Sequence, residues 1–492
     1  MLTEKSYHPT IESTEREHFM TDAAGSGEPS SAAERSGSAR SSTAPLSRSL
    51  IIKWCMWSWG NSTVSAVMTT FVFGTYITSE AFGSGDRGAQ YLAVATAVAG
   101  AIIALTAPVI GQRTDKAGRR RLWLSLNTVM VVIMVAACFF VRPEEGYLLL
   151  GVTLMALMGI FDEFANLNYN AMITDISDHQ RMGRVSGMGW GSGYLGGIVL
   201  LLVVYVGMIE GDWLGIGTDE AVNIRAVALV GALWHLIFAL PLLLSRLPTA
   251  DQQSVEEKVS ITESYRRLFR VLIGLWQQDR NTLWFLISSA IYRDGLSAVF
   301  TWGAVLGVHV YYIEDATIPF TQVAGSVLLF GIAGNVIAAL GAFIGGWFDD
   351  RIGPRRVIAI SLSSLLVIAV IMWIMVRPVD VGIFTMTPVQ AFWLFGLLLC
   401  LFVGPAQASS RAFLGRLAPP ARAGELFGLY ATAGRGMSFV TPALIGTLIA
   451  VFGGQVMAIP GIIIVLAAGL GLLLARVHDP TGPAAMHEHR RS

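Results

Sequence analysis

Long runs of apolar residues alternate with short polar segments from about residue 50 to residue 476. Each run is about 20 residues long or more, enough for a helix to cross a hydrocarbon layer about 30 Å thick. Because lipid offers no partners to backbone polar groups, each run predicts an α-helix. We therefore predict an all-α membrane protein with twelve transmembrane helices, at residues 51–78, 90–111, 122–141, 147–172, 184–207, 222–245, 283–312, 323–347, 357–376, 388–411, 425–451 and 455–475.

The polar segments divide the chain into parts. We predict a disordered cytoplasmic tail, a six-helix half, a cytoplasmic linker, a second six-helix half and a cytoplasmic tail, at residues 1–48, 49–247, 248–282, 283–476 and 477–492. The first tail is rich in Ser, Thr, Gly, Ala and Glu, a composition that does not bury an apolar core. In the linker, apolar residues recur at helical spacing after Ser260, with Arg266 and Arg270 off that stripe, so we expect an amphipathic helix on the membrane surface.

Composition excludes several classes of function. The chain has 492 residues, of which 53% are hydrophobic and only 14% are charged, far less charge than soluble proteins carry. The formal net charge is zero, so nothing indicates a nucleic-acid partner. The three cysteines lie inside apolar runs without metal-ligand spacing, and no phosphate-binding loop, Ser-His-Asp set or zinc motif stands out. We expect no enzyme activity, no cofactor and no metal.

The basic residues fix the predicted orientation. They concentrate in the linker and in the loops after even-numbered helices, whereas acids such as Glu210, Asp212 and Glu220 occupy loops after odd-numbered helices. The positive-inside bias then places both termini and the linker in the cytoplasm, with the protein in the cell membrane.

A basic turn occurs twice. Residues 111–121 and 346–356 both read G-x-x-x-D-[KR]-x-G-x-R-R, and the copies are 235 positions apart. A second pattern, G-x-x-x-G, begins at Gly183 and again at Gly424, 241 positions later. Such offsets indicate a duplicated bundle, with halves related by an axis along the membrane normal.

The repeated turn supplies the candidate gate residues. They are Gly111, Asp115, Gly118, Arg120, Gly346, Asp350, Arg351 and Gly353. The two aspartates can cap the next helix or pair with a nearby arginine. Gly118 and Gly353 allow the chain to reverse, with positive φ. Anchoring of the basic clusters at the membrane surface is the alternative.

Polar residues inside the predicted helices supply the candidate substrate site. The candidates are Trp57, Asn61, Asp162, Glu163, Asn166, Arg293, Asp294, Asn335 and Arg435. The charged members lie about ten residues from the same end of their helices, about 15 Å at a rise of about 1.5 Å per residue. Charges in lipid are costly, so residues at a shared depth predict a midplane cavity. The alternatives are structural ion pairs for the charges and helix packing for Trp57.

The acids and bases in this layer do not balance. Three acids face two bases, so we expect one carboxylate without a partner, which can carry a proton. Asp162 is the first choice because Asn166 and Asn170 continue its helix face. Glu163 points about 100° away and can instead pair with an arginine. We also expect Trp54 to be an interfacial anchor and His235 to be hydrogen-bonded in the core.

These motifs carry a family resemblance. The repeated turn resembles the loop between the second and third helices of major facilitator transporters, and its echo between the eighth and ninth. Residues 168–176, 183–197 and 404–411 resemble the branch that contains fungal vacuolar amino-acid effluxers and their bacterial relatives. The resemblance implies that the repeated turn latches the cytoplasmic side in one state and releases it in the other. It also implies export.

The resulting expectation is a monomeric secondary transporter that works by alternating access. Its solute would be small, polar and organic, an amino acid or a related metabolite, with protons as a candidate coupling ion. Two alternatives on the same fold stay open. One is a membrane sensor or scaffold that does not transport, and the other is a lipid translocator.

Overall fold

The computed structural model describes residues 48–479, except residues 84, 117–118, 210–212, 214, 218, 246–260, 316, 319, 376–378 and 381–384. Both predicted tails therefore lie almost entirely outside the described residues, as do Gly118 and the first part of the linker.

The described chain is almost entirely helical. Its main helices are α1 (Arg48–Ser62), α2 (Phe73–Ile77), α3 (Gly85–Lys116), α4 (Arg120–Ala137), α5 (Leu148–Ala171), α6 (Ile173–Ile176), α7 (Met182–Val204), α8 (Val222–Leu243), α9 (Ile261–Gln278), α10 (Arg280–Glu314), α11 (Phe320–Ile352), α12 (Pro354–Met375), α13 (Pro388–Leu417), α14 (Ala423–Met437), α15 (Val440–Phe452) and α16 (Ala458–Arg476). Short 3₁₀ segments are Glu80–Phe82, Cys138–Phe140, Glu145–Tyr147, Asp219–Ala221, Pro420–Arg422 and Gln455–Met457, and π-helical segments are η1 (Thr63–Phe71) and η5 (Tyr205–Ile209). Two antiparallel strands of two residues, β1 (Val379–Asp380) and β2 (Thr385–Met386), lie between α12 and α13.

The predicted count of twelve membrane helices is not reached. Among the described residues, ten helical segments are long and apolar enough to cross a membrane, and α10, bent by 42°, makes an eleventh. The first predicted span, residues 51–78, is divided into α1, η1 and α2. Within η1 the hydroxyl groups of Thr69 and Thr70 donate to carbonyls five residues earlier, which favours the wider π turn.

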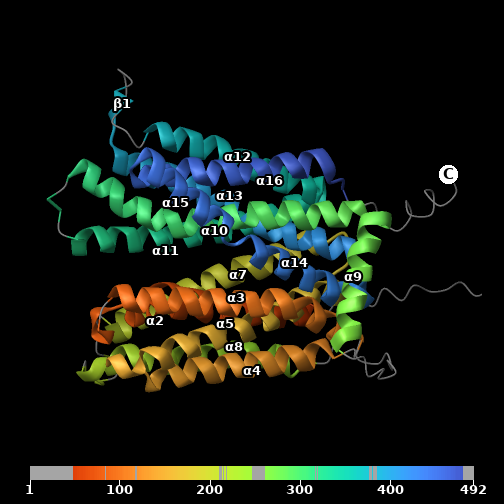
Figure 1. Ribbon diagram of the computed structural model, residues 1–492, viewed down its shortest axis with the longest axis horizontal. Helices are drawn as coiled ribbons and strands as arrows, with labels where there is room; N and C mark the ends of the chain where they lie inside the picture. Colours follow the sequence, from red (N-terminus) through yellow and green to blue (C-terminus); the bar gives the residue numbers. More distant parts are fainter. Residues whose placement is uncertain are drawn as a thin grey trace, which may run out of the picture. The chain divides into compact units, whose positions relative to one another are not determined.

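The helices before and after the linker form two groups that lie side by side (Figure 1). Helices α3, α5 and α7 of the first group pack against α11, α13 and α14 of the second. The linker helix α9 crosses the end of the bundle and packs on α3 and α10 (Figure 1). The Tyr265 hydroxyl of α9 donates to Leu105 O of α3 at 2.9 Å, which ties the linker to the first group.

Candidate functional site

A polar cavity of about 410 Å³ lies where the two helix groups meet. Helices α5 and α7 line it from one side and α10, α13, α14 and α15 from the other. Its lining residues are Glu163, Trp190, Arg293, Asp294, Ser297, Ala298, Thr301, Trp302, Gln407, Ala431, Gly434, Arg435, Ser438 and Pro442. Four of the nine residues expected at the substrate site are thus on its wall.

Glu163 and Arg435 form an ion pair across the cavity. Arg435 Nη2 donates to Glu163 Oε2 at 2.5 Å, and the side chains are 37% and 22% exposed. The pair joins α5 of the first helix group to α14 of the second. Because the pair links these two helices, any movement that separates α5 from α14 must break it.

Arg293 has a different environment. Its guanidinium lies over the Tyr430 ring, 3.8 Å from the centroid, and its Nη1 donates to Tyr430 O at 3.5 Å. No carboxylate of the described residues forms an ion pair with it, although it lines the same cavity as Glu163 and Asp294. A guanidinium held on an aromatic face retains donors for an anionic group in the cavity.

The carboxylate of Asp294 accepts hydrogen bonds from the first turn of α15. Its Oδ2 accepts hydrogen bonds from Thr441 N at 2.8 Å and from Thr441 Oγ1 at 2.6 Å. Thr441 is in the first turn of α15, where backbone N–H groups have no partner within the helix. Asp294 therefore stabilises the break between α14 and α15, inside the segment that we expected to be one helix over 425–451.

Asp162 is not among the residues that line the cavity. Its Oδ1 is buried and has no hydrogen-bond partner among the described residues. The side chains of Asn61 and Asn166 lie against its carboxyl group, and Asn166 Nδ2 also donates to Asp162 O at 3.0 Å. None of these three residues lines the cavity, so the expectation that Asn61 and Asn166 form its wall is wrong.

Two other candidates also lie off the cavity wall, and Trp57 has the alternative role of helix packing. Trp57 is fully buried, stacks on Tyr169 at 4.4 Å between ring centroids, and donates from Nε1 to Thr128 Oγ1 at 3.0 Å. It packs α1 against α4 and α5 instead of lining the cavity. Asn335 donates to Gly331 O within α11, at 2.8 Å, and is not on the cavity wall either. Equal depth along a helix did not determine which direction each side chain faces.

Trp54 and His235 differ from expectation too. Trp54 is fully buried and stacks on Tyr169 at 4.3 Å, so it is not an interfacial anchor. His235 is fully buried, but neither ring nitrogen has a hydrogen-bond partner within the described chain. Its ring lies edge-on to Trp57 at 6.1 Å, an apolar contact rather than a polar one.

The first copy of the repeated turn holds the opposite helix group. Asp115 Oδ1 accepts from Gly424 N at 3.0 Å, and Oδ2 accepts from Glu425 N at 2.8 Å. The carboxylate thus caps α14 instead of the next helix. The other expected contact, a pair with a nearby arginine, is present. Arg120 donates to Asp115 at 2.6 Å and to Asp175 at 2.8 Å. We call Asp115, Arg120, Asp175, Gly424 and Glu425 the first turn cluster.

The second copy repeats this arrangement. Asp350 Oδ1 accepts from Gly183 N at 2.8 Å and Oδ2 from Arg184 N at 3.2 Å, so it caps α7. Arg416 pairs with Asp350 at 3.2 Å and also with Asp349. We call Gly183, Arg184, Asp349, Asp350 and Arg416 the second turn cluster. Each copy of the basic turn therefore binds the start of the G-x-x-x-G segment in the other helix group.

Close approach of the backbones makes these contacts possible. A Cβ atom on Gly111 would overlap Gly424 O, and one on Gly346 would lie 2.5 Å from Gly183 O. Gly353 has φ +88°, as expected for the reversal of the second turn. Arg351 lies over the Trp347 ring at 3.1 Å rather than in the second turn cluster.

Arg411 is a buried cation that the sequence analysis did not identify. It is 4% exposed and lies on α13, four residues from the cavity residue Gln407. The predicted span 388–411 ended at this residue, because the apolar run ends there. The helix continues to Leu417 inside the protein, so Arg411 is enclosed and not at a membrane surface.

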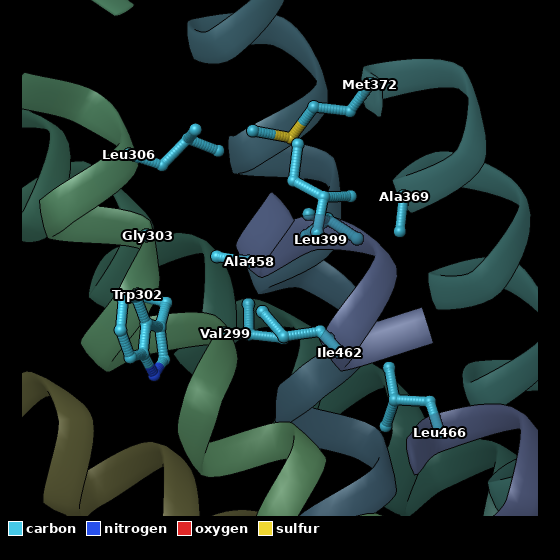
Figure 2. Close-up of a pocket in the computed structure, with 11 residues that line it drawn as sticks. Val299, Trp302, Gly303, Leu306, Ala369, Met372, Leu399, Ala458, Ile462 and Leu466 are labelled. Atoms are coloured by element: carbon cyan, nitrogen blue, oxygen red, sulfur yellow. The ribbon is translucent and has the colours of Figure 1, made fainter. Parts of the chain in front are cut away.

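A second, smaller pocket is entirely apolar at its wall. It has a volume of about 30 Å³ and is surrounded by side chains such as Val299, Leu306, Met372 and Ile462 (Figure 2). Trp302 lines both this pocket and the polar cavity. A space of that size holds about one water molecule, so it is a packing gap and not a solute site.

Comparisons with known proteins agree with this architecture. The family model "Vacuole effluxer Atg22 like" matches residues 88–479. The chain belongs to this Atg22-like family. It is therefore a major facilitator transporter and not an enzyme.

Within the Atg22-like family and its superfamily, several relatives are similar. The uncharacterized MFS-type transporter YxiO of Bacillus subtilis (strain 168) is 25% identical over 433 residues, covering 87% of this chain and 94% of the relative. Autophagy-related protein 22-1 of Aspergillus fumigatus is 24% identical over 284 residues, covering 54% of this chain and 43% of the relative. The crystal structure of FucP in the outward conformation has a TM-score of 0.61 at 16% identity, covering 88% and 98% of the two chains, and shows a shared fold.

Proposed function

We propose that the protein is a secondary transporter that exports a small carboxylate-bearing organic solute, such as an amino acid, by alternating access. The observation that carries this proposal is Arg293, whose guanidinium opens into the polar cavity without a carboxylate partner among the described residues. A partly buried guanidinium of this kind is suited to bind a carboxylate through two parallel hydrogen bonds.

The cavity suits a zwitterion as well as a simple anion. Carboxylates of Glu163 and Asp294 share its wall with the guanidinium groups of Arg293 and Arg435. Ser297, Thr301 and Gln407 add hydroxyl and amide groups that can orient a polar solute. A volume of about 410 Å³ is sufficient for a small metabolite and lies in the range of ligand pockets, about 300–1,000 Å³.

Alternating access would use the two helix groups as rigid halves, residues 49–247 and 283–476. The two turn clusters would hold the cytoplasmic end closed, and their release would open it. Both termini and the linker lie in the cytoplasm in this proposal, and the working unit is a monomer in the cell membrane. Export follows the name of the family model, since that name describes an effluxer.

Asp162 would carry the coupling proton. Its buried Oδ1 has no partner among the described residues, and it lies one residue from the Glu163–Arg435 ion pair. A carboxyl group that is enclosed and unpaired can exchange a proton when solvent reaches it. Entry of a proton from outside would then be linked to exit of the solute.

Transport by purified protein in liposomes tests this proposal. Liposomes loaded with a labelled mixture of common L-amino acids should release label faster when the outside is acidified. Arg293→Gln should lower the rate at subsaturating solute about 10- to 100-fold, because a charged hydrogen bond contributes about 1.5–3 kcal/mol. Arg266→Gln, at an exposed arginine of the linker helix α9 outside both copies of the repeated turn, is the matched control and should transport normally.

The coupling group has its own variant in the same assay. Asp162→Asn should fold and still exchange solute across the membrane, but its rate should no longer depend on the pH gradient. Equal pH dependence in this variant and the wild type would exclude Asp162 as the proton carrier. Absence of amino-acid release by the wild type would contradict the proposed solute.

A further inference from the structure

Arg411 is a buried charge without a counter-charge. Its Nε donates to Ser186 Oγ at 2.9 Å, its Nη2 to Ser186 O at 2.5 Å, and its Nη1 to Asn170 Oδ1 at 3.1 Å. All three acceptors are neutral, and no carboxylate of the described residues forms an ion pair with it. Arg120, Arg416 and Arg435, in contrast, each contact at least one carboxylate.

Aromatic rings complete the enclosure of this guanidinium. It lies 4.7 Å from the centroid of the Trp54 ring, 5.6 Å from that of Tyr169 and 5.7 Å from that of Trp190. Cation–π contacts compensate part of the cost of burying the charge. If Arg411 only tied the helices together, a carboxylate partner would suit it better than neutral acceptors, since a paired charge costs less to bury than an unpaired one.

The position of Arg411 connects it to the cavity. Trp190 contacts the guanidinium and also lines the cavity, and Gln407 lines the cavity one helical turn before Arg411 on α13. On its other side, the same helix continues to Arg416 of the second turn cluster. Arg411 therefore lies between the polar cavity and the contacts that close one end of the bundle.

The partners of Arg411 belong to the opposite helix group. Asn170, Ser186 and Trp190 are on α5 and α7, whereas Arg411 is on α13. Release of the second turn cluster would separate α7 from α11 and α13, and the guanidinium would then lose its hydrogen bonds to Ser186. Its donors would face the widened cavity at the moment when that cavity opens to the cytoplasm.

We propose that Arg411 is a second binding position for the carboxylate of the solute, used when the cytoplasmic end is open. This inference rests on the proposed function: Arg293 holds the anionic group in the closed-gate state, and Arg411 holds it in the open-gate state. When the solute is absent, the guanidinium would donate its hydrogen bonds to the neutral acceptors of Ser186 and Asn170, so its donors would not be left without partners.

The test uses two full-length proteins in detergent, the wild type and a variant in which both aspartate caps are removed. We call this variant, Asp115→Ala with Asp350→Ala, the gate-released variant. Binding of a mixture of common L-amino acids, and of a mixture of the corresponding amino-acid amides, is measured by thermal shift. In the gate-released variant, Arg411→Gln should weaken binding of the acids about tenfold or more, the effect of losing one charge-assisted pair. Arg266→Gln should leave binding of the acids unchanged, and the amides should bind weakly throughout.

A second measurement leaves Arg411 in place, in case Arg411→Gln does not fold. Phenylglyoxal modifies accessible arginines, and mass spectrometry reports the extent at each site. Arg411 should be protected in the wild type, reactive in the gate-released variant, and protected again there by the amino-acid mixture but not by the amides. Reactivity that the amino acids do not change would overturn the proposal.

The outcomes separate this inference from the proposed function. If Arg293→Gln abolishes binding in the wild-type background but Arg411→Gln has no effect in the gate-released variant, Arg411 is only a structural tie. If neither background binds the amino-acid mixture, both the second site and the proposed solute are wrong.

Discussion

The two turn clusters make the same kind of contact between the helix groups, but their charged residues come from different elements. In both, an aspartate of the repeated turn accepts hydrogen bonds from two backbone N–H groups of a helix in the opposite group. The arginine comes from different places, however. Arg120 belongs to the repeated turn itself and binds Asp175, whereas Arg416 belongs to α13 and binds Asp349.

The exchange of charge follows the duplication. Asp175 and Arg416 are 241 positions apart, the same offset as Gly183 and Gly424, so an acid in one half occupies the position of a base in the other. Arg355, the counterpart of Arg120, donates instead to Leu474 O at 3.0 Å. Both clusters share an aspartate that caps a helix of the opposite group. The arginine that neutralises this aspartate comes from the repeated turn in one cluster and from α13 in the other.

Removal of the arginines should have the largest effect on stability. Arg120→Gln leaves Asp115 and Asp175 buried without a cation. Arg416→Gln does the same to Asp349 and leaves Asp350 only its contact with the half-exposed Arg184. Breaking a buried pair in this way costs about 3–5 kcal/mol of the free energy of unfolding, and we expect similar losses in both clusters. Unfolding in mixed micelles measures this loss, with Arg266→Gln as the control. A loss below about 1 kcal/mol in one cluster only would show that the clusters are not equivalent.

Removal of the aspartate caps should have a smaller effect, and mainly on conformation. Asp115→Ala and Asp350→Ala each remove charged hydrogen bonds worth about 1.5–3 kcal/mol, but only in the state in which the helix groups meet. Each should therefore shift the population toward the open cytoplasmic end about 10- to 100-fold, without preventing binding of solute. Spin-label distances between the cytoplasmic ends report the shift. Unchanged distances with normal transport would leave the repeated turn only an anchoring role.

Two half-exposed arginines, Arg184 of the second turn cluster and Arg422 beside the first, should matter least. Arg184 contacts Asp350 at 3.2 Å and Arg422 contacts Glu425 at 2.9 Å, but their side chains are 50% and 51% exposed. Solvent screens such pairs, so Arg184→Gln and Arg422→Gln should each change the free energy of unfolding by about 0–1 kcal/mol. A larger loss at one position would reveal a difference between the clusters that the buried contacts do not show.

Sequence patterns located the turn clusters because a duplication leaves equal offsets. Asp115 and Asp350 follow from the repeat alone, but their partners Gly424 and Gly183 are far away in sequence and required the structure. From the sequence, each aspartate was expected to cap the next helix or to pair with a nearby arginine, and the pairing is present in both clusters. Packing between the helix groups places the cap on a helix of the opposite group instead.

The cavity was harder to predict. Counting residues gave the common depth of Glu163, Arg293 and Arg435, but it did not give the direction of each side chain around its helix. Trp57 is therefore packed in the core at a depth where we expected a cavity wall. Arg411 was missed because an apolar run measures contact with lipid, and a helix that continues inside the protein can carry a charge beyond the end of that run.

The span count shows a similar limit. Hydropathy marks residues 51–78 as one membrane segment, but it does not detect the π-helical turns of η1 within it. The break between α14 and α15, which Asp294 stabilises, is likewise set by a side chain from another helix. Fold class follows from the apolar pattern, whereas local departures from the α-helix depend on tertiary contacts.

Binding of matched solutes to Arg293 tests the central claim most directly. Thermal shifts of the purified protein are compared for common L-amino acids and for their amides, which lack the carboxylate. A ligand of the native state raises its stability, so at least one amino acid should raise the melting temperature while its amide does not, and Arg293→Gln should remove that difference. Equal shifts for acid and amide, or an unchanged preference in Arg293→Gln, would contradict the assignment of the cavity to a carboxylate-bearing solute.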